Sequence, residues 1–184
     1  MKDIVKYIYE IGQLKIIKRS GWWRAGIKCP ESIAEHSFRT AIIGYILGKL
    51  EGADYFKILA MCLFHDVHEV RINDINKIGK KYLKHNINEV KITEDQIINL
   101  PKNIFKELLS FQKSFVKEDT SESIIAKDAD LLECLVQARE YQSQGYKDVV
   151  KWIVDCKSNL ITESAKKLAD YFIQNEPSDW WGEM

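Results

Sequence analysis

The sequence has few residues that interrupt helices, and it lacks the paired cysteines of common metal and redox motifs. Only 3 prolines and 9 glycines occur among its 184 residues, and most apolar residues recur at intervals of three and four. The 4 cysteines lie far apart without a C-x-x-C pair, which argues against a zinc ribbon or a thioredoxin-like motif. We therefore expect an all-α fold, with residues 1–184 forming a single domain.

Neither sign of charge dominates the chain. The 27 lysines and arginines are balanced by 27 aspartates and glutamates, which argues against a large binding surface for polymeric nucleic acid or an anionic membrane. The N-terminus has no apolar segment followed by a cleavage site, and no uninterrupted apolar run reaches membrane-spanning length. The expected location is therefore the cytoplasm.

Periodicity and capping residues divide the chain into a series of expected helices. Ser32 and Glu35 fit a capping box, Asp54 can cap the helix after it, and Thr93 with Gln96 is a possible further capping box. Residues 77–100 are expected to form surface helix and loop. The other expected helices cover residues 2–14, about 31–50, 54–64, 101–115, 120–142, and, as one helix or a pair, about 147–174.

A histidine and an aspartate, His65 and Asp66, stand side by side at the end of an unbroken apolar run. Such a run is buried, and a buried carboxylate beside a buried imidazole costs several kcal/mol unless both find partners. A divalent metal ion is the simplest partner, because it accepts a neutral imidazole nitrogen and a carboxylate oxygen in one site. If the helix continues for one more turn, Glu69 reaches the same opening.

Residues elsewhere in the chain could complete such a site. His36 lies on a helix face that turns toward the core, although a lone histidine there is more often a hydrogen-bonded core residue than a ligand. A later buried helix carries Asp128 and Asp130, and periodicity does not choose between them. Asp74, taken alone, would be a turn residue or a helix cap. Two imidazoles and two carboxylates suit Mn²⁺, Co²⁺, Fe²⁺ or Zn²⁺ better than Ca²⁺.

The loop before His36 combines two arginines with two tryptophans, between Lys18 and Arg24. Two interpretations remain open for it. The loop could lie on the surface with its indoles covering the core. Alternatively, it could place an anion-binding arginine beside an aromatic platform.

The ordered motifs, H…HD…D on an all-α chain, resemble the HD-domain superfamily of metal-dependent phosphohydrolases. Within it they look like the bacterial 5′-deoxynucleotidases and their archaeal and eukaryotic relatives. The resemblance runs from about residue 10 to about residue 145, with the C-terminal helices after about residue 147. It is carried by residues 18–24, 32–37, 65–70, 73–74 and 126–130.

The resemblance implies a role for each matching residue. It selects Asp130 over Asp128, and it makes Glu69 the acidic residue needed for catalysis, with Asp66 a second group able to hold the water. His68 is an extra histidine in the motif, and we expect it to be solvated. The implied metal ligands are His36, His65, Asp66 and Asp130, and the implied substrate-binding residues are Arg19, Asp74 and the loop aromatic Trp22.

The implied activity is hydrolysis of a nucleoside 5′-monophosphate by in-line attack of water at a divalent metal ion, with Mg²⁺ possible besides the four ions above. The implied partner is a small nucleotide. Together with Trp180 and Trp181 near the C-terminus, the resemblance also favours a homodimer. The alternatives are a non-catalytic metal and nucleotide-binding module, and a hydrolase of nucleoside triphosphates, cyclic nucleotides or alarmones.

Overall fold

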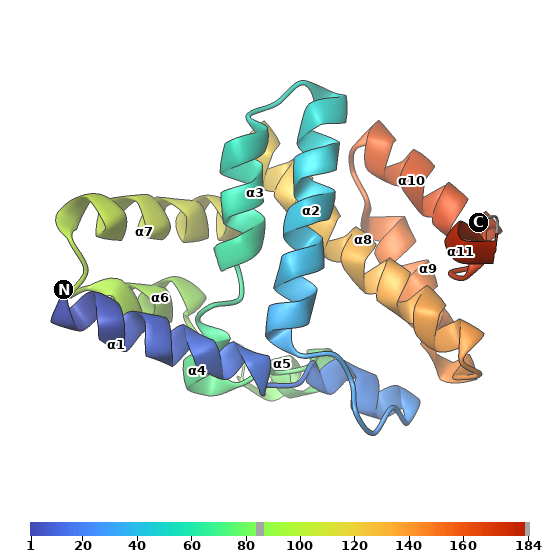
Figure 1. The fold of residues 1–184 in the computed structure, drawn as a ribbon, viewed down its shortest axis with the longest axis horizontal. Helices are drawn as coiled ribbons and strands as arrows, with labels where there is room; N and C mark the ends of the chain where they lie inside the picture. The colour runs from blue at the N-terminus through green and yellow to red at the C-terminus, as the bar shows by residue number, and fades with distance from the viewer. Residues whose placement is uncertain (84–86, 183–184) are drawn as a thin grey trace.

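The computed structural model describes residues 1–83 and 87–182, and throughout this part of the chain the regular elements are helices (Figure 1). The expected all-α fold is thereby confirmed. No helix in the described ranges combines the length and the apolar character needed to cross a lipid bilayer. The α-helices are α1 Lys2–Ile11, α2 Ile33–Glu51, α3 Tyr55–Phe64, α4 Glu69–Ile72, α5 Lys77–Leu83, α6 Glu89–Ile97, α7 Lys102–Lys117, α8 Ser121–Ser143, α9 Val150–Asn159, α10 Glu163–Gln174 and α11 Asp179–Gly182, and the 3₁₀ helices are η1 Gly12–Lys15, η2 Ser20–Ala25 and η3 Lys147–Val149.

Helices α2 and α3 run side by side and approach each other closely (Figure 1). Two glycines of α2 make this approach possible. A Cβ at Gly44 would lie 2.5 Å from the sulfur of Cys62, and a Cβ at Gly48 would lie 2.9 Å from the Cα of Tyr55. The tight contact fixes the position of the C-terminal end of α3, where the His65–Asp66 pair follows.

Helix α8 is the central element, because it packs against α2, α3, α9 and α10 (Figure 1). The main core lies between these helices and is continuous across them. Burying large aliphatic side chains from several helices at once is the main force that holds such a bundle together. Fully buried members of this core include Leu47 of α2, Ile58 of α3, and Leu132 and Leu135 of α8.

A second, smaller apolar cluster joins α6 and α7 to the N-terminal helix. Ile97, Leu100, Leu108 and Leu109 are its buried members, and side chains of α1 pack against it. Phe64, the last residue of α3, packs against this cluster. A third cluster of Leu14, Ile33 and Val67 holds the segment that follows α3 against η1 and the start of α2.

Two expected elements differ from those observed, and one conditional extension of a helix does not occur. The first α-helix ends at Ile11 and continues as η1. Helix α3 ends at Phe64, so Glu69 is not on a continuation of it but opens the separate helix α4 after a series of turns. Thr93 and Gln96 lie inside α6, whose cap is Asn88. The capping box of Ser32 and Glu35, by contrast, is present at the start of α2 as expected.

Candidate metal centre

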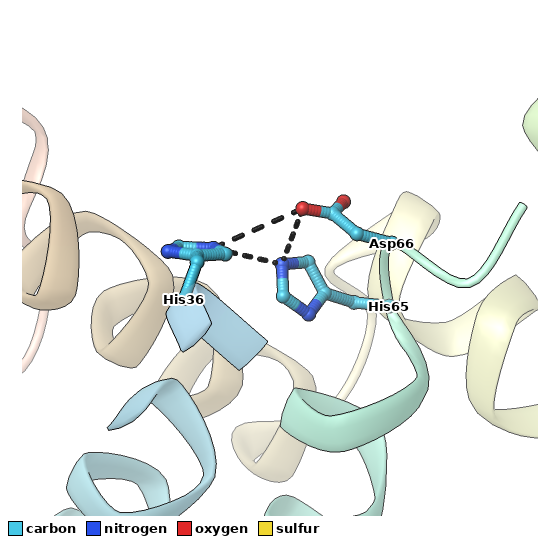
Figure 2. Close-up of side chains that lie close together, drawn as sticks. All are labelled: His36, His65 and Asp66. Atoms are coloured by element: carbon cyan, nitrogen blue, oxygen red, sulfur yellow. Dashed lines mark hydrogen bonds and ion pairs between the residues drawn. The ribbon is translucent and has the colours of Figure 1, made fainter. Parts of the chain in front are cut away.

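Four side chains from three parts of the chain converge between α2, α3 and α8. His36 extends from the second turn of α2, His65 and Asp66 follow the last residue of α3, and Asp130 extends from α8. The Nε2 atom of His36 lies 3.4 Å from Nε2 of His65, 3.8 Å from Oδ2 of Asp66 and 3.3 Å from Oδ1 of Asp130. The three residues drawn in Figure 2 direct these atoms toward one another.

His36, His65 and Asp66 bring ligand atoms within 4.8 Å of one another, close enough for one divalent cation, and Oδ1 of Asp130 lies beside the two histidines. His65 Nε2 is 3.0 Å from Asp66 Oδ2 and 3.9 Å from Asp130 Oδ1. Ligand atoms about 2.0–2.2 Å from a shared ion lie roughly 3 Å apart when they are neighbours in its coordination sphere. Both imidazoles are buried while both carboxylates are partly exposed, so the cluster opens on its carboxylate side.

Each imidazole is oriented through its second ring nitrogen. His65 Nδ1 lies 2.7 Å from the backbone oxygen of Cys62, and His36 Nδ1 lies 2.5 Å from Oε2 of Glu133. If each Nδ1–H donates to its oxygen partner, each Nε2 presents a lone pair to the cluster. This arrangement of a ligand histidine and an outer acceptor is common to protein metal sites.

The carboxylates of the cluster are held in the ionised form. Burial would raise the pKa of Asp66, but His65 and Arg19 outweigh it and hold that pKa well below its usual range. Burial acts on Asp130 in the same way, and Lys127 and His36 hold its pKa far below the usual value. The Nζ of Lys127 donates to Oδ2 of Asp130 at 3.1 Å, which leaves Oδ1 directed at the histidines.

The pKa of Glu69 moves upward, in contrast to those of Asp66 and Asp130. Its side chain is 4% exposed, and its Oε2 is buried without a hydrogen-bond partner among the described residues. Burial, together with the charges of Asp66 and Asp74, raises its pKa to about 9. A buried carboxyl with a free oxygen beside a metal-ligand set is typical of a residue that handles a proton.

Arg19 reaches the cluster from a loop that is fastened to the start of α2. Its backbone N–H donates to the oxygen of Glu31 at 3.0 Å, and the neighbouring Lys18 and Ser32 form an isolated antiparallel bridge. From this position its Nη1 donates to Oδ2 of Asp66 at 3.3 Å. A guanidinium is therefore held beside the open side of the cluster.

Asp74 is tied to the residue that follows Arg19. Its Oδ2 accepts a hydrogen bond from the backbone N–H of Ser20, and its carbonyl oxygen accepts one from the Ser20 hydroxyl at 2.9 Å. The segment after α4 and the loop that carries Arg19 are thus joined at one residue. The structure therefore brings Arg19, Asp74 and Glu69 to the same side of the four-residue cluster.

Residues 11–170 match the protein family described as HD domain. The chain belongs to the HD domain family. It is 31% identical to 5′-deoxynucleotidase HDDC2 of Dictyostelium discoideum, over 79% of this chain and 81% of that protein, and 26% identical to 5′-deoxynucleotidase HDDC2 of Homo sapiens, over 79% and 72%. A solved structure of a conserved hypothetical protein from Pyrococcus furiosus has a TM-score of 0.74 and 26% identity, over 93% of this chain and 99% of that one.

In this HD domain, the two neighbouring aspartates of α8 have separate environments. Asp128 is buried and accepts hydrogen bonds from the backbone N–H groups of Ile161 and Thr162 at 2.9 and 2.7 Å, and from the Thr162 hydroxyl at 2.7 Å. It fastens the connection between α9 and α10 to α8. Only Asp130 turns toward the histidines, as the resemblance implies.

The structure places Trp22 in the core of the HD domain. Its side chain is 2% exposed and packs between the rings of Tyr141 and Trp152, with centroids 5.2 and 5.5 Å away. Its indole N–H donates to Oε1 of Glu31 at 2.9 Å. Because its ring and its N–H are both in contact with other residues inside the protein, Trp22 is better placed to hold the Arg19 loop in position than to contact a nucleobase.

The expectation of a solvated His68 is wrong. His68 is buried, and its Nδ1 lies 3.1 Å from the backbone oxygen of His65. The chain turns after Phe64 instead of continuing as a helix, and the side chain of His68 thereby lies against the backbone of His65. Its Nε2 faces Glu89 of α6 at 4.0 Å, which links this turn to the smaller apolar cluster.

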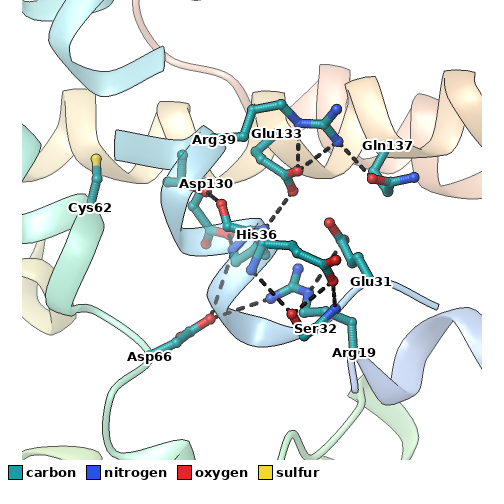
Figure 3. A network of polar contacts seen from close by, with 12 residues as sticks. Arg19, Glu31, Ser32, His36, Arg39, Cys62, Asp66, Asp130, Glu133 and Gln137 are labelled. Carbon is teal, nitrogen blue, oxygen red and sulfur yellow. Dashed lines mark hydrogen bonds and ion pairs between the residues drawn. The ribbon is translucent and has the colours of Figure 1, made fainter. Parts of the chain in front are cut away.

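Two residues around the site were missed by reasoning from the sequence. Glu133 contacts His36, and Arg39 contacts Glu133, in the polar network drawn in Figure 3. A signal for both was present: each lies three residues after a candidate ligand, Glu133 after Asp130 and Arg39 after His36, so each pair shares one face of a helix. Charged residues on largely buried helices need partners.

Proposed function

We propose that this chain is a metal-dependent phosphohydrolase that removes the 5′-phosphate from nucleoside monophosphates, with a preference for deoxynucleotides. One observation carries the proposal: four imidazole and carboxylate donors converge beside a guanidinium and a buried carboxyl with a free oxygen. Relatives named 5′-deoxynucleotidase, which match most of this chain, support the choice of substrate.

His36, His65, Asp66 and Asp130 would hold the metal ion through the atoms that face one another. The mixed nitrogen and oxygen donors suit Mn²⁺, Co²⁺, Fe²⁺ or Zn²⁺, and Mg²⁺ is a further candidate. When bound, such an ion polarises a phosphoryl oxygen and lowers the pKa of a water molecule. Because the two carboxylates are the more exposed donors, a phosphate ester would approach from their side.

Glu69 would hold the attacking water and accept its proton. Burial and neighbouring charges raise the pKa of Glu69 to about 9 in the metal-free chain, and the charge of a bound cation would lower that pKa, so that the ionised carboxylate would be available as a base. Its Oε2, which has no partner among the described residues, is the atom available for this contact. The alternative acceptor is the Oδ1 atom of Asp66. The Oδ2 atom of the same residue already contacts both His65 and Arg19.

Arg19 and Asp74 would position the two ends of the substrate. Arg19 is already beside the open side of the cluster and can neutralise charge on the phosphoryl group as the leaving 5′ oxygen departs. Asp74 would accept a hydrogen bond from the sugar 3′-hydroxyl. Asp74 accepts a hydrogen bond from the backbone N–H of Ser20, the residue after Arg19. The residues proposed to bind the phosphate and the sugar are therefore held in a fixed relation to each other.

The experiment that tests this function measures phosphate release from a panel of nucleotides. Dialysed protein would be supplied with Mn²⁺, Co²⁺, Fe²⁺, Zn²⁺ or Mg²⁺ and given dAMP, dGMP, dTMP and the matching ribonucleotides. Release from the 5′-deoxynucleoside monophosphates supports the proposal. Nucleotide binding without release under every metal would instead identify a non-catalytic module, and release only from triphosphates, cyclic nucleotides or alarmones would move the enzyme to another substrate class.

We also propose that the chain forms a homodimer in the cytoplasm. Helix α2 exposes a row of uncharged side chains at helical spacing, among them Phe38, which is 65% exposed. An apolar row of this kind can pair with the same row of a second copy about a two-fold axis. Mass determination in solution, with Ile42→Glu as the disrupting variant, tests the pairing. The exposed side chains concerned are Phe38, Ile42, Tyr45, Ile46 and Leu50 of α2, with Trp180 and Trp181 as a second exposed pair.

A further inference from the structure

Glu133 of α8 contacts both a candidate metal ligand, His36, and the guanidinium of Arg39. These contacts lie on the buried side of the site, between α2 and α8, which we call the closed side. Glu133 is 0% exposed, and each of its oxygens has a partner on α2 (Figure 3). Oε2 lies 2.5 Å from Nδ1 of His36, and Oε1 accepts a hydrogen bond from Nε of Arg39 at 2.9 Å and lies 2.8 Å from its Nη2. The contacts form a line from the guanidinium, through the carboxylate, to the imidazole.

The geometry settles which nitrogen of His36 is free for a metal ion. An ionised carboxylate can only accept hydrogen bonds, so the Nδ1 atom that faces Glu133 must carry a proton. The lone pair of the neutral ring then lies on Nε2, which faces His65 and Asp130. A carboxylate in this position both selects the tautomer and prevents the ring from turning.

Burial alone would favour the neutral acid of Glu133, and the donors of His36 and Arg39 that face its two oxygens favour the ionised form. The guanidinium of Arg39 also donates to Oε1 of Glu140 at 2.7 Å and to Oε1 of Gln137 at 2.7 Å. Four of its contacts therefore lie on one face of α8, and the planar fork cannot turn without losing several of them. Arg39 holds the carboxylate in a fixed direction, toward His36.

A second metal ion is the competing explanation for this cluster, because Glu31, His36 and Glu133 bring ligand atoms close enough together for one. The surrounding donors argue against it. The guanidinium of Arg39 already occupies Oε1 of Glu133, and the indole N–H of Trp22 occupies Oε1 of Glu31. The positive charge that the two carboxylates require is supplied by arginine.

We propose that Glu133 and Arg39 are a positioning pair for His36: Glu133 sets its tautomer and ring direction, and Arg39 keeps Glu133 aimed. The pair acts on metal affinity through His36 and does not touch the substrate. The proposal rests on the proposed function only in taking His36 as a metal ligand. It makes no use of the nucleotide or of the hydrolysis step.

The variant Glu133→Gln tests the pair with little change in shape. Its amide would have to present an NH₂ group either to Arg39, where donor would face donor, or to His36. In the second case Nδ1 becomes the acceptor, and the proton moves to Nε2, the nitrogen that faces the other ligands. Both outcomes weaken metal binding.

The measurement is the dissociation constant for Co²⁺ and Zn²⁺, obtained by competition with a chromophoric chelator, together with the visible spectrum of the Co²⁺ form. We expect Glu133→Gln to raise the dissociation constant about 10–100-fold and to alter the spectrum. Glu140→Gln is the matched control, because Glu140 also contacts Arg39 from α8 but is partly exposed and does not touch His36. That variant should stay within about two-fold of the parent protein.

A double variant provides a rescue that a merely structural role would not give. With Arg39→Met added to Glu133→Gln, the amide NH₂ no longer faces a guanidinium, so its oxygen can turn to the His36 Nδ1–H. Affinity should recover by several-fold over Glu133→Gln alone, which is the non-additive result expected of residues in direct contact. Equal affinity of Glu133→Gln and the parent protein would overturn the proposal, as would strictly additive losses.

A measurement on the unmodified chain keeps the proposal testable if the variants fail to fold. In the Zn²⁺-loaded protein, ¹⁵N NMR of the histidine rings should show His36 protonated at Nδ1 and bound at Nε2. The opposite assignment would refute the role of Glu133. These results are separate from the nucleotidase test, because a protein that binds metal as described but releases no phosphate would refute only the proposed function.

Discussion

The two sides of the candidate metal centre are built differently. On the closed side, between α2 and α8, Glu133 is buried with both oxygens engaged, and elsewhere on α8 Asp128 accepts three hydrogen bonds from the connection between α9 and α10. On the open side, in the segment after α3, Glu69 is buried with an unpaired oxygen among the described residues and a pKa raised to about 9. Both sides bury acidic residues, but only the first supplies partners for all of them.

The difference separates residues that hold the site from a residue that is free to react. A buried carboxylate with its hydrogen bonds complete stabilises one geometry, whereas a buried carboxyl that lacks a partner costs stability and is available to a ligand. The comparison leads to variants whose effects on activity and on stability should go in different directions.

The largest expected contrast is between the two aspartates of α8. Asp130→Asn should abolish metal-dependent phosphate release with a small effect on folding, because a neutral amide replaces the carboxylate whose Oδ1 faces His36 and would bind the metal ion. Asp128→Asn should keep the activity but lower the free energy of unfolding by about 1–3 kcal/mol, since it weakens the contacts to Ile161 and Thr162. Phosphate assays and urea unfolding check both, and the reverse pattern would exchange the roles of the two residues.

Glu69→Gln should lower kcat about 10²–10⁴-fold while the dissociation constant of the metal stays close to that of the parent protein. The same change should stabilise the metal-free protein by about 1–3 kcal/mol at neutral pH, because glutamine, unlike a carboxyl with its pKa raised to about 9, takes up no proton on folding. Turnover, chelator competition and urea unfolding measure the three quantities. A fully active Glu69→Ala protein would remove this residue from the mechanism.

Gly48→Ala tests the packing that places the open side of the site. The added Cβ would meet the Cα of Tyr55 at 2.9 Å, and backbone cannot move away as a flexible side chain can. We expect a loss of about 1–3 kcal/mol in the free energy of unfolding, larger than the gain in helix propensity from replacing glycine by alanine. Gly12→Ala is the matched control, because a Cβ there meets nothing within 4 Å.

The last prediction concerns the pH dependence of stability. The pKa of Glu69 is raised from 4.5 to about 9 in the folded chain, so between these values the folded state binds a proton that the unfolded state has released. Its contribution to stability is therefore fully present below pH 4.5 and is lost as the pH rises toward 9. In a chelator-containing buffer, the stability advantage of Glu69→Gln should grow over this interval. An advantage that is constant with pH would contradict the shift.

The parts that could be predicted from the sequence depend on local signals. Ser32 and Glu35 cap α2 as expected, Asp54 caps α3, and Thr120 caps α8, because each cap is decided by residues within one turn. Apolar residues on nearly every face of residues 120–142 predicted a buried, central helix, and α8 is that helix. These local signals were enough to predict α2, α3 and α8, the helices that carry or directly precede the candidate ligands.

The parts that were missed depend on contacts between distant segments. The predicted end of this helix at Phe64 agrees with α3, but no glycine or proline in residues 65–69 signals the turns that place Glu69 beside the site, so packing imposes them. Glu133 and Arg39 are far apart in the sequence and acquire their meaning only when α2 meets α8. The sequence left two interpretations open for the loop that contains Trp22, and only the contacts of the folded chain show that this side chain lies in the core.

The burial of Trp22 gives the protein an internal optical reporter. Its indole lies 5.5 Å from that of Trp152 with the rings inclined at 32°, and it stands three residues from Arg19 in the same loop. Two indoles at this separation couple their electronic transitions, so near-ultraviolet dichroism would follow the loop that carries the guanidinium. Docking of a phosphate ester could then be observed without attaching any dye, by light that the chain itself absorbs.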